Sequence, residues 1–115
     1  MADRTFPKVE RIVHRREYEE LGKHGAKLHT KNFIIIWAVA GEGETRIGIT
    51  ASRKVGSAVC RNRVKRLVRE YYRLHKDKFE GAFFNIIARK GAALLDYPEL
   101  CREFDAMLPR IAKQK

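Results

Sequence analysis

The sequence has few of the features that hold secreted, zinc-binding or membrane-spanning proteins together. Its 115 residues include two cysteines, Cys60 and Cys101, which lie far apart and form no C-x-x-C pair. Their spacing gives no sign of a disulfide framework or a zinc site, and leaves a single bridge between them open. The longest apolar run, residues 33–40, is far shorter than the ~20 residues that span a membrane. Because no apolar stretch of signal-peptide length appears near the first residue, we expect a cytoplasmic protein with reduced cysteines.

Acidic residues are also scarce, and they are scattered along the chain. There are 14 Asp and Glu against 25 Lys and Arg, and the net charge is +11. A protein nuclease needs carboxylates clustered around metal ions, or paired histidines for acid–base chemistry. The four histidines, His14, His24, His29 and His75, have no partners at ligand spacing, so we expect them at the surface or in turns. The sequence therefore predicts no catalytic residue and no metal ligand.

The positive charge is concentrated in one short segment. Between Arg53 and Arg73 the chain carries eight basic residues and one acid, Glu70, which gives +7 in 21 residues. A charge this large and uneven indicates a polyanionic partner, most often nucleic acid and less often an anionic membrane.

Length and composition predict one α+β domain over residues 1–115, with residues 1–8 and 112–115 flexible. With 44% hydrophobic residues the chain can build a core. Hydrophobic periodicity and turn residues predict the order α-β-β-α-β-α and a small, mostly antiparallel sheet packed by helices. The expected elements are a helix over 14–21, strands over 33–40 and 45–52 joined as a hairpin by a turn at 41–44, a helix over 57–78, a strand over 82–90, and a helix over 96–111 that begins near Pro98 and is limited by Pro109.

The predicted helix over 57–78 has two faces. At ~100° per residue, its basic side chains fall in a sector of roughly 140°. This sector holds Arg61, Lys65, Arg66, Arg69, Arg73 and Lys76, with Asn62, and the opposite side holds Val64, Leu67, Val68, Tyr71 and Leu74. An ordinary solvated face is the alternative, but such faces mix signs, because stacked like charges cost ~0.2–0.5 kcal/mol per close pair. With no helix-turn-helix, C2H2, RRM or KH signature, we expect an RNA-binding protein of ribosomal or processing type.

One segment resembles a known family. "ASRKVGSAVCRNRVKRLVRE", residues 51–70, is similar to the RNR motif of the bacterial ribonuclease P protein family: a basic dipeptide, a Val-Gly step, an apolar spacer, then R-N-R-x-K-R-x-x-R. "YEELGKHGAKLHTKNFIIIW", "TRIGITAS" and "NIIARKGA" also resemble the family's first helix and its strands. The resemblance covers about residues 8–108 in the right order.

The resemblance implies an αβββαβα-type domain with an unusual left-handed βαβ crossover, against the usual right-handed rule. It implies the protein subunit of a ribonucleoprotein endonuclease that removes the 5′ leader from precursor tRNA. The chemistry is then done by the RNA subunit with Mg²⁺ held mainly by that RNA and the substrate. The implied partners are ribonuclease P RNA and precursor tRNA, with no membrane and no obligate protein partner. A structural ribosomal protein and a metal-dependent nuclease are the alternatives.

The resemblance also assigns roles to residues. Those implied to bind RNA are Arg53, Lys54, Arg61, Asn62, Arg63, Lys65, Arg66, Arg69 and Arg73. Asn62 is equally suited to cap the helix start, and Arg63, off the main stripe, is expected at the rim between the basic face and the leader cleft. Residues implied to line that cleft are Tyr18, Ile34 and Ile36, with ordinary core as their alternative. Gly22 and Ile36 stand where many members have aromatic residues, which predicts reduced stacking.

Overall fold

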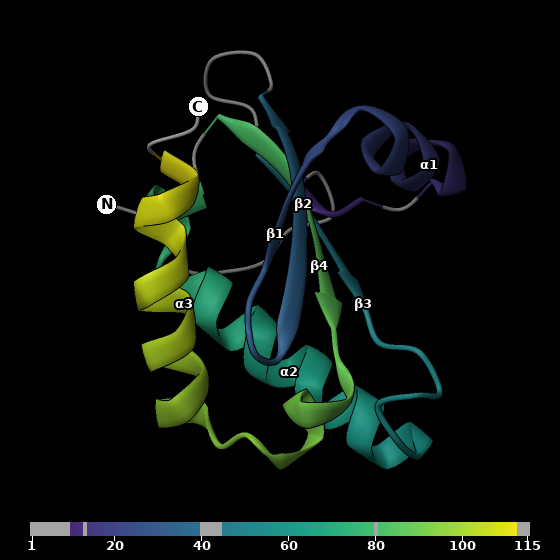
Figure 1. Cartoon of the computed structure of the whole chain (residues 1–115), viewed down its shortest axis with the longest axis vertical. Coiled ribbons are helices and arrows are strands. Elements are labelled where there is room, and N and C mark those ends of the chain that lie inside the picture. The colour runs from purple at the N-terminus through teal and green to yellow at the C-terminus, as the bar shows by residue number, and fades with distance from the viewer. Residues whose placement is uncertain (1–9, 13, 40–44, 80, 113–115) are drawn as a thin grey trace.

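The computed structural model describes residues 10–12, 14–39, 45–79 and 81–112 (Figure 1). The elements are α1 (Arg15–His24), β1 (Ala26–His29), β2 (Phe33–Val39), β3 (Arg46–Thr50), α2 (Ala58–Leu74), β4 (Ala82–Ala88) and α3 (Tyr97–Ala112), with 3-10 helices at Lys76–Phe79 and Lys90–Leu94. The predicted α+β class is confirmed. The turn expected at 41–44 and the ends 1–8 and 113–115 lie outside the described residues. Within the described ranges, no helix combines the length and apolar character that crossing a membrane requires.

The four strands form one mixed sheet in the order β1-β2-β4-β3. β2 pairs antiparallel with β1 and β4, whereas β3 runs parallel to β4. The hairpin expected between 33–40 and 45–52 is therefore wrong, because β4 lies between the two strands. The reason is the burial of β4: Ala82, Phe84 and Ile86 have no exposed surface, and a strand that is apolar on both faces is best placed in the centre of a sheet.

β1 is an element that hydrophobic periodicity did not predict, although the order implied by the family resemblance has a third strand before the second helix. It is four residues long, and Leu28 is its one buried side chain. So short a segment with a single buried apolar residue shows no alternation. Its pairing with β2 forms the strand, with Leu28 opposite Ile35 and Lys27 opposite Ile36.

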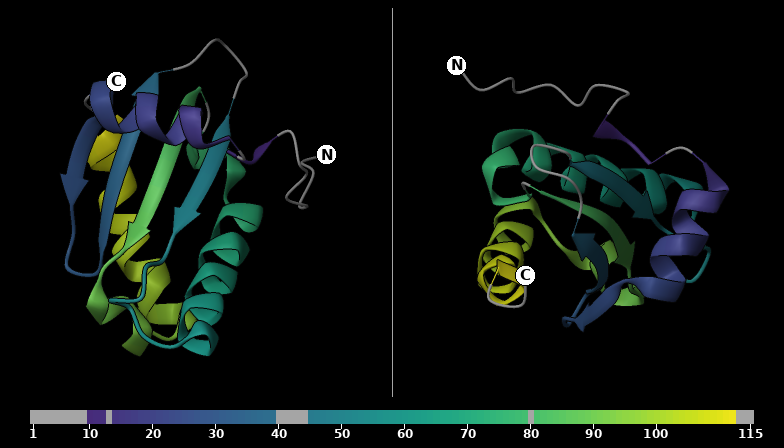
Figure 2. Two further views of the ribbon diagram at one scale, coloured as in Figure 1. Left: turned by 90° about the vertical axis from the view of Figure 1, so that its right-hand side faces the viewer. Right: turned by 90° about the horizontal axis from the view of Figure 1, so that it is seen from above.

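The connection from β3 through α2 to β4 is a left-handed crossover. In the left view of Figure 2, both strands run downward, β4 lies to the left of β3, and α2 lies on the face away from α1. When the sheet is turned so that the strands run upward, β4 lies to the right of β3 with the helix behind them. This arrangement is the reverse of the usual right-handed crossover and agrees with the expectation from the family resemblance.

The sheet has a thick core on one face and a thin one on the other. Phe33, Ile35 and Trp37 alternate toward α2 and α3 and join the main core. Ile34, Ile36 and Ala38 point to the opposite face, where Ile12, Leu21 and Ile36 form a small buried cluster under α1. Figure 2 shows α1 crossing the sheet near one end. No other helix of the described residues covers the rest of that face.

α2 is shorter than predicted and rotated relative to the expected faces. Ser57 caps it by accepting from the Cys60 backbone N–H (3.3 Å), and Gly56 precedes the cap at φ 145°, which favours glycine. The helix ends at Leu74 and a 3-10 helix follows. Its buried residues are Val64, Val68, Tyr71 and Tyr72, whereas Leu67 is half-buried and Leu74 is 40% exposed. The buried face is thus turned toward the Tyr72 side of the helix.

α3 closes the main core with Leu100, Phe104, Met107, Leu108 and Ile111, all buried. Pro98 lies in its first turn as predicted, but the helix continues past Pro109 to Ala112. Glu103 anchors α3 to the β1–β2 turn, since its carboxylate accepts from the Thr30 hydroxyl and from both the backbone N–H and the side-chain amide of Asn32.

Candidate nucleic-acid interface

The basic side chains that precede and follow the start of α2 are grouped here under one name, the basic surface. Its members are Arg53, Lys54, Arg61, Arg63, Lys65, Arg66 and Arg69. Arg53, Lys54, Arg66 and Arg69 are exposed and the other three are half-buried. No acidic side chain of the described residues forms an ion pair with any of the seven.

Five carboxylates elsewhere in the described chain pair with other basic groups. The pairs are Arg15–Glu19 (3.0 Å), Arg46–Glu17 (2.7 Å), Arg73–Glu70 (2.6 Å), Lys76–Glu10 (3.1 Å) and Lys78–Asp105 (3.1 Å). Arg73 and Lys76, which the sequence placed on the basic face, are therefore partly neutralised. The positive charge of the basic surface, in contrast, has no counter-charge among the described residues.

Asn62 and Arg61 differ from the other residues of the motif in their surroundings. Asn62 is exposed inside α2, and Ser57 is the N-cap, so the capping alternative for Asn62 is wrong. The Nε of Arg61 is buried with no hydrogen-bond partner in the described part of the chain, although the residue as a whole is half-exposed. A buried donor without a partner costs about 1–3 kcal/mol.

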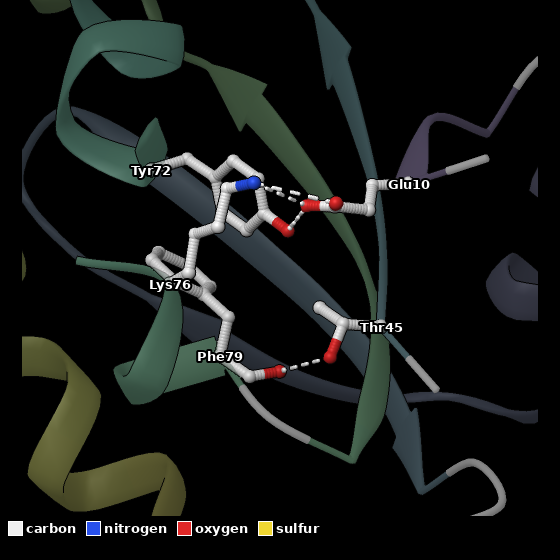
Figure 3. Close-up of polar contacts among 5 residues, drawn as sticks. All are labelled: Glu10, Thr45, Tyr72, Lys76 and Phe79. Atoms are coloured by element: carbon white, nitrogen blue, oxygen red, sulfur yellow. Dashed lines mark hydrogen bonds and ion pairs between the residues drawn. The ribbon is translucent and has the colours of Figure 1, made fainter. Parts of the chain in front are cut away.

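A short N-terminal segment, residues 10–12, runs along the free edge of β3 and joins it to α2. The backbone N–H of Ile12 donates to the carbonyl of Ile47 (3.0 Å). Glu10 reaches across to the end of α2, where its carboxylate accepts from the Tyr72 hydroxyl and pairs with Lys76 (Figure 3). The hydroxyl of Tyr18 in α1 donates to the Ile12 carbonyl (3.1 Å). This segment therefore fixes the positions of α1, β3 and α2 relative to one another.

Three rows of side chains cross the sheet on the face under α1. The strand registers give Ala38, Phe83 and Arg46 in the first row, Lys27, Ile36, Asn85 and Gly48 in the second, and His29, Ile34, Ile87 and Thr50 in the third. α1 covers the first row and part of the second, since Leu21 and Tyr18 pack there. Glu17 of α1 also pairs with Arg46 of the first row. The third row, with two half-buried isoleucines between polar ends, lies on the open part of the sheet.

Tyr18 lies directly over β3 because Gly48 has no side chain. A Cβ on Gly48 would come within 2.5 Å of the Tyr18 ring. Burial, with a smaller contribution from the neighbouring Glu17 carboxylate, raises the pKa of Tyr18, so its hydroxyl remains a hydrogen-bond donor at neutral pH. The ring is thus fixed between α1 and the strand.

A cleft of about 520 Å³ opens between α1 and the sheet, lined by Arg15, Tyr18, Thr50 and Asn85. A second, smaller cavity of about 120 Å³ lies at the edge of β3. Its lining comprises Arg11, Ile12, Tyr18, Ile47, Gly48, Ile49 and Arg69. Tyr18 lines both hollows, and Arg69 belongs to the basic surface of α2. The two hollows are therefore neighbours on either side of Tyr18, and the smaller one borders the basic surface at Arg69.

The predicted cleft residues occupy different positions. Tyr18 lines the cleft. Ile34 is half-buried on the same face, in the open third row, whereas Ile36 is buried beside Leu21 in the small cluster under α1. Arg63 lines neither hollow. Arg63 lies about 120° around α2 from Arg69, on the side of the helix that carries Glu70. The structure therefore does not place Arg63 at the rim of the cleft.

Sequence reasoning missed Arg15, Thr50 and Asn85 as cleft residues. Asn85 could have been noticed, because it is the one polar residue in the strand segment "AFFNIIA". Thr50 and Arg15 carried no such signal, since their position depends on how β3 and α1 pack against β4.

The histidines lie where the sequence predicted. His14, His24 and His29 are exposed, and His75 is half-buried at the end of α2, where its ring stacks on Tyr71 with centroids 4.1 Å apart. Among the described residues, no group of three or more His, Cys, Asp or Glu side chains could hold a metal ion. Cys60 and Cys101 are free thiols, both half-buried.

Comparison with known structures supports the same fold. The Staphylococcus aureus RNase P protein superposes with a TM-score of 0.81 at 27% identity, over 92% of this chain and 97% of that one. The Thermotoga maritima RNase P protein superposes with a TM-score of 0.79 at 30% identity, over 88% of this chain and 96% of that one.

Comparison of sequences gives the family. The family model for ribonuclease P matches residues 6–112. The chain is 49% identical over 109 residues to the ribonuclease P protein component of Geotalea uraniireducens (strain Rf4), covering 95% of this chain and 96% of that protein. It is 40% identical over 114 residues to that of Geobacter sp. (strain M21), covering 99% and 98%. The chain therefore belongs to the family of bacterial ribonuclease P protein components, the protein subunits of the ribonucleoprotein endonuclease that matures the 5′ end of tRNA.

Proposed function

We propose that the chain serves ribonuclease P through two joined surfaces: the basic surface binds the RNA subunit, and the cleft under α1 binds the 5′ leader of precursor tRNA. The observation that carries this proposal is that a smaller hollow shares Tyr18 with the cleft and Arg69 with the basic surface, so the two surfaces lie next to each other. A single strand that leaves the RNA-bound side of α2 would reach the cleft without crossing an acidic barrier formed by the described residues.

The basic surface suits a phosphate backbone. Its five arginines and two lysines have no ion pairs with described acids, so binding a polyanion would relieve repulsion without breaking existing pairs. Arginines can fork two hydrogen bonds onto one phosphate, and lysines act as point charges.

The cleft suits a short single strand. Tyr18 offers an aromatic ring, and base–aromatic stacking contributes ~1–3 kcal/mol per base. Ile34 and Ile87 provide an apolar floor beyond α1, and Arg15 stands at the wall with its side chain 92% exposed. With one ring in the cleft, we expect leader affinity to come from one stacked base together with charge and apolar contact.

The proposal leaves the hydrolytic chemistry, and the Mg²⁺ ions that the family resemblance implies, with the RNA subunit and the substrate. The described residues do not fit a magnesium site, because their carboxylates are not grouped. Five of them, Glu10, Glu17, Glu19, Glu70 and Asp105, are engaged by basic groups. No step of the reaction is assigned to a protein-bound metal. The protein's part is to bind and orient, and its proposed place is the cytoplasm.

The first test is reconstitution. The purified chain alone should leave precursor tRNA uncut, and adding the chain to a bacterial ribonuclease P RNA should restore 5′ cleavage at low magnesium concentration. Cleavage by the chain without RNA, or no stimulation of the RNA, would contradict the proposal. Co-sedimentation of the chain with a ribosomal subunit in high salt, together with no stimulation, would favour a structural ribosomal protein instead.

The second test addresses the basic surface. Replacing Arg66 and Arg69 by alanine should weaken binding to the RNA subunit and reduce the slope of log K against log salt by about 0.7–0.9 per lost phosphate contact. The free energy of unfolding should change by less than about 0.5 kcal/mol, because both side chains are exposed. Arg102→Ala, an exposed arginine on α3, is the matched control and should leave the slope unchanged. If Arg102→Ala reduces the slope as much, the basic surface is not the RNA-binding face.

A further inference from the structure

The floor of the cleft carries an amide in a place where a strand normally carries an apolar side chain. Asn85 is the one polar residue of β4, and it is 8% exposed. It lies in the second row of the sheet, between Ile36 on β2 and Gly48 on β3. A buried amide destabilises a fold unless its polar atoms are hydrogen-bonded, so the partners of Asn85 are informative.

Of the two polar atoms of the Asn85 side chain, only the oxygen has a partner among the described residues. The Thr50 hydroxyl donates to the Asn85 Oδ1 at 2.9 Å, which fixes the side chain. The amide nitrogen bonds to no described residue. Asn85 and Thr50 both line the cleft, so a strand in the cleft would lie beside this amide and could accept from its nitrogen.

The neighbours of the amide suit a flat, hydrogen-bonding ligand. Gly48, the next residue in the same row, leaves no side chain above β3, and Tyr18 lies over that glycine. A nucleobase beside Tyr18 would present its edge to Asn85. Of the parts of a nucleotide, the base edge differs between the four nucleotides, whereas phosphate and sugar carry no sequence information.

We propose that Asn85, positioned by Thr50, reads one base of the precursor-tRNA leader and makes this protein selective for the nucleotide at that position. The amide N–H donates to a ring nitrogen or carbonyl oxygen of the base, and the second lone pair of Oδ1 can accept from an exocyclic amine. This inference rests on the proposed function of the cleft. The alternative is that the Thr50–Asn85 bond only tethers β3 to β4, in which case ligand selectivity is unaffected by either residue.

The test uses the holoenzyme reconstituted with a bacterial ribonuclease P RNA and a set of precursor tRNAs in which each leader position carries each of the four bases in turn. With the unmodified protein, one position should show base-dependent affinity of about 5- to 150-fold, the range for a good side-chain–base pair. Asn85→Leu should abolish that preference and leave the salt dependence unchanged. Thr50→Val, which keeps the amide but releases it, should reduce the preference.

Thr45→Val is the matched control for Thr50→Val. Thr45 directly precedes β3, and its hydroxyl donates to the Phe79 carbonyl (Figure 3). It does not line the cleft. It should keep the full base preference. A flat base profile in the unmodified holoenzyme, or an unchanged preference in Asn85→Leu, would overturn the inference. If the holoenzyme binds leader-bearing and leaderless tRNA equally well, the proposed function of the cleft itself fails, and that outcome is measured separately from base preference.

Discussion

Gly48 and Tyr18 show how one missing side chain shapes the site. The ring of Tyr18 occupies the volume that any other residue at position 48 would fill. The phenol hydroxyl then meets the carbonyl of Ile12, which links α1 to the segment along β3. The position of the aromatic ring in the cleft is therefore set by a glycine on a neighbouring strand.

We predict that Gly48→Ala displaces Tyr18 and lowers the free energy of unfolding by about 1–3 kcal/mol, the usual cost of overpacking. Leader affinity should fall as well, since the ring leaves the cleft. Urea unfolding and binding of leader-bearing against leaderless tRNA measure the two effects.

Gly22→Ala provides the matched control for the same chemical change. A Cβ on Gly22 meets no atom within 4 Å, and the residue lies inside α1. Alanine should therefore stabilise the protein by up to about 1 kcal/mol through helix propensity. An equal loss of stability in both variants would show that Gly48 has no special contact with Tyr18.

At the scale of the elements, α2 and α3 are joined by a polar contact at the edge of the main core. The Tyr71 hydroxyl donates to the Asp105 carboxylate (2.6 Å), and Lys78 pairs with the same oxygen. The Tyr71 hydrogen bond chiefly, and Lys78 next, hold the pKa of Asp105 below its ordinary value, although partial burial opposes them. The same contact and burial raise the pKa of Tyr71, so it remains a donor.

This contact predicts a dependence of stability on pH. Because the folded pKa of Asp105 is lower than the unfolded value near 3.9, its stabilising contribution is present above about pH 4 and is lost as the pH falls through the folded pKa. Asp105→Asn should be less stable than the unmodified protein at about pH 7 and should lose less stability on acidification to about pH 3. Urea midpoints at the two pH values measure the difference.

The control is Asp77→Asn, an exposed carboxylate with no hydrogen bond or ion pair to the described residues. Its stability should fall with pH in parallel with that of the unmodified protein. If Asp105→Asn shows the same pH dependence as Asp77→Asn, the Tyr71–Asp105 contact does not stabilise the fold.

At the scale of the whole molecule, Glu10 links the two faces of the sheet. Its carboxylate contacts Tyr72 and Lys76 of the α2 side, while the residues after it run along β3 toward α1 (Figure 3). The cleft under α1 therefore depends on an anchor on the opposite face.

Glu10→Gln should lower the free energy of unfolding by about 1–3 kcal/mol, because the charge-assisted contacts are half-buried. Hydrogen exchange at the Ile12 amide should become faster, and leader affinity should fall while affinity for the RNA subunit stays the same. Glu19→Gln, whose partner Arg15 is 92% exposed, should change stability by about 0–1 kcal/mol. Unchanged exchange at Ile12 in Glu10→Gln would contradict the anchoring role.

Elements that depend on neighbouring residues could be predicted from the sequence, whereas elements that depend on distant residues could not. The two-faced character of α2 and the Pro98 start of α3 depend on neighbours within a few residues, and they were predictable, although the buried face of α2 is turned toward Tyr72 and leaves Leu74 exposed. The central place of β4 was not, because pairing between distant strands is decided by which strand buries both faces and both edges. The short strand β1 exists only through β2.

The sequence by itself determined the basic surface and the family, because charge concentrated in one segment and an ordered motif are local properties of the chain. Only the tertiary structure decided which positive charges remain without counter-charges, since the acids that neutralise Arg46, Lys76 and Lys78 come from other elements. It also decided the cleft. Arg15, Tyr18, Thr50 and Asn85 meet because the left-handed crossover places α2 on the face of the sheet opposite α1, and α1 covers only part of its own face.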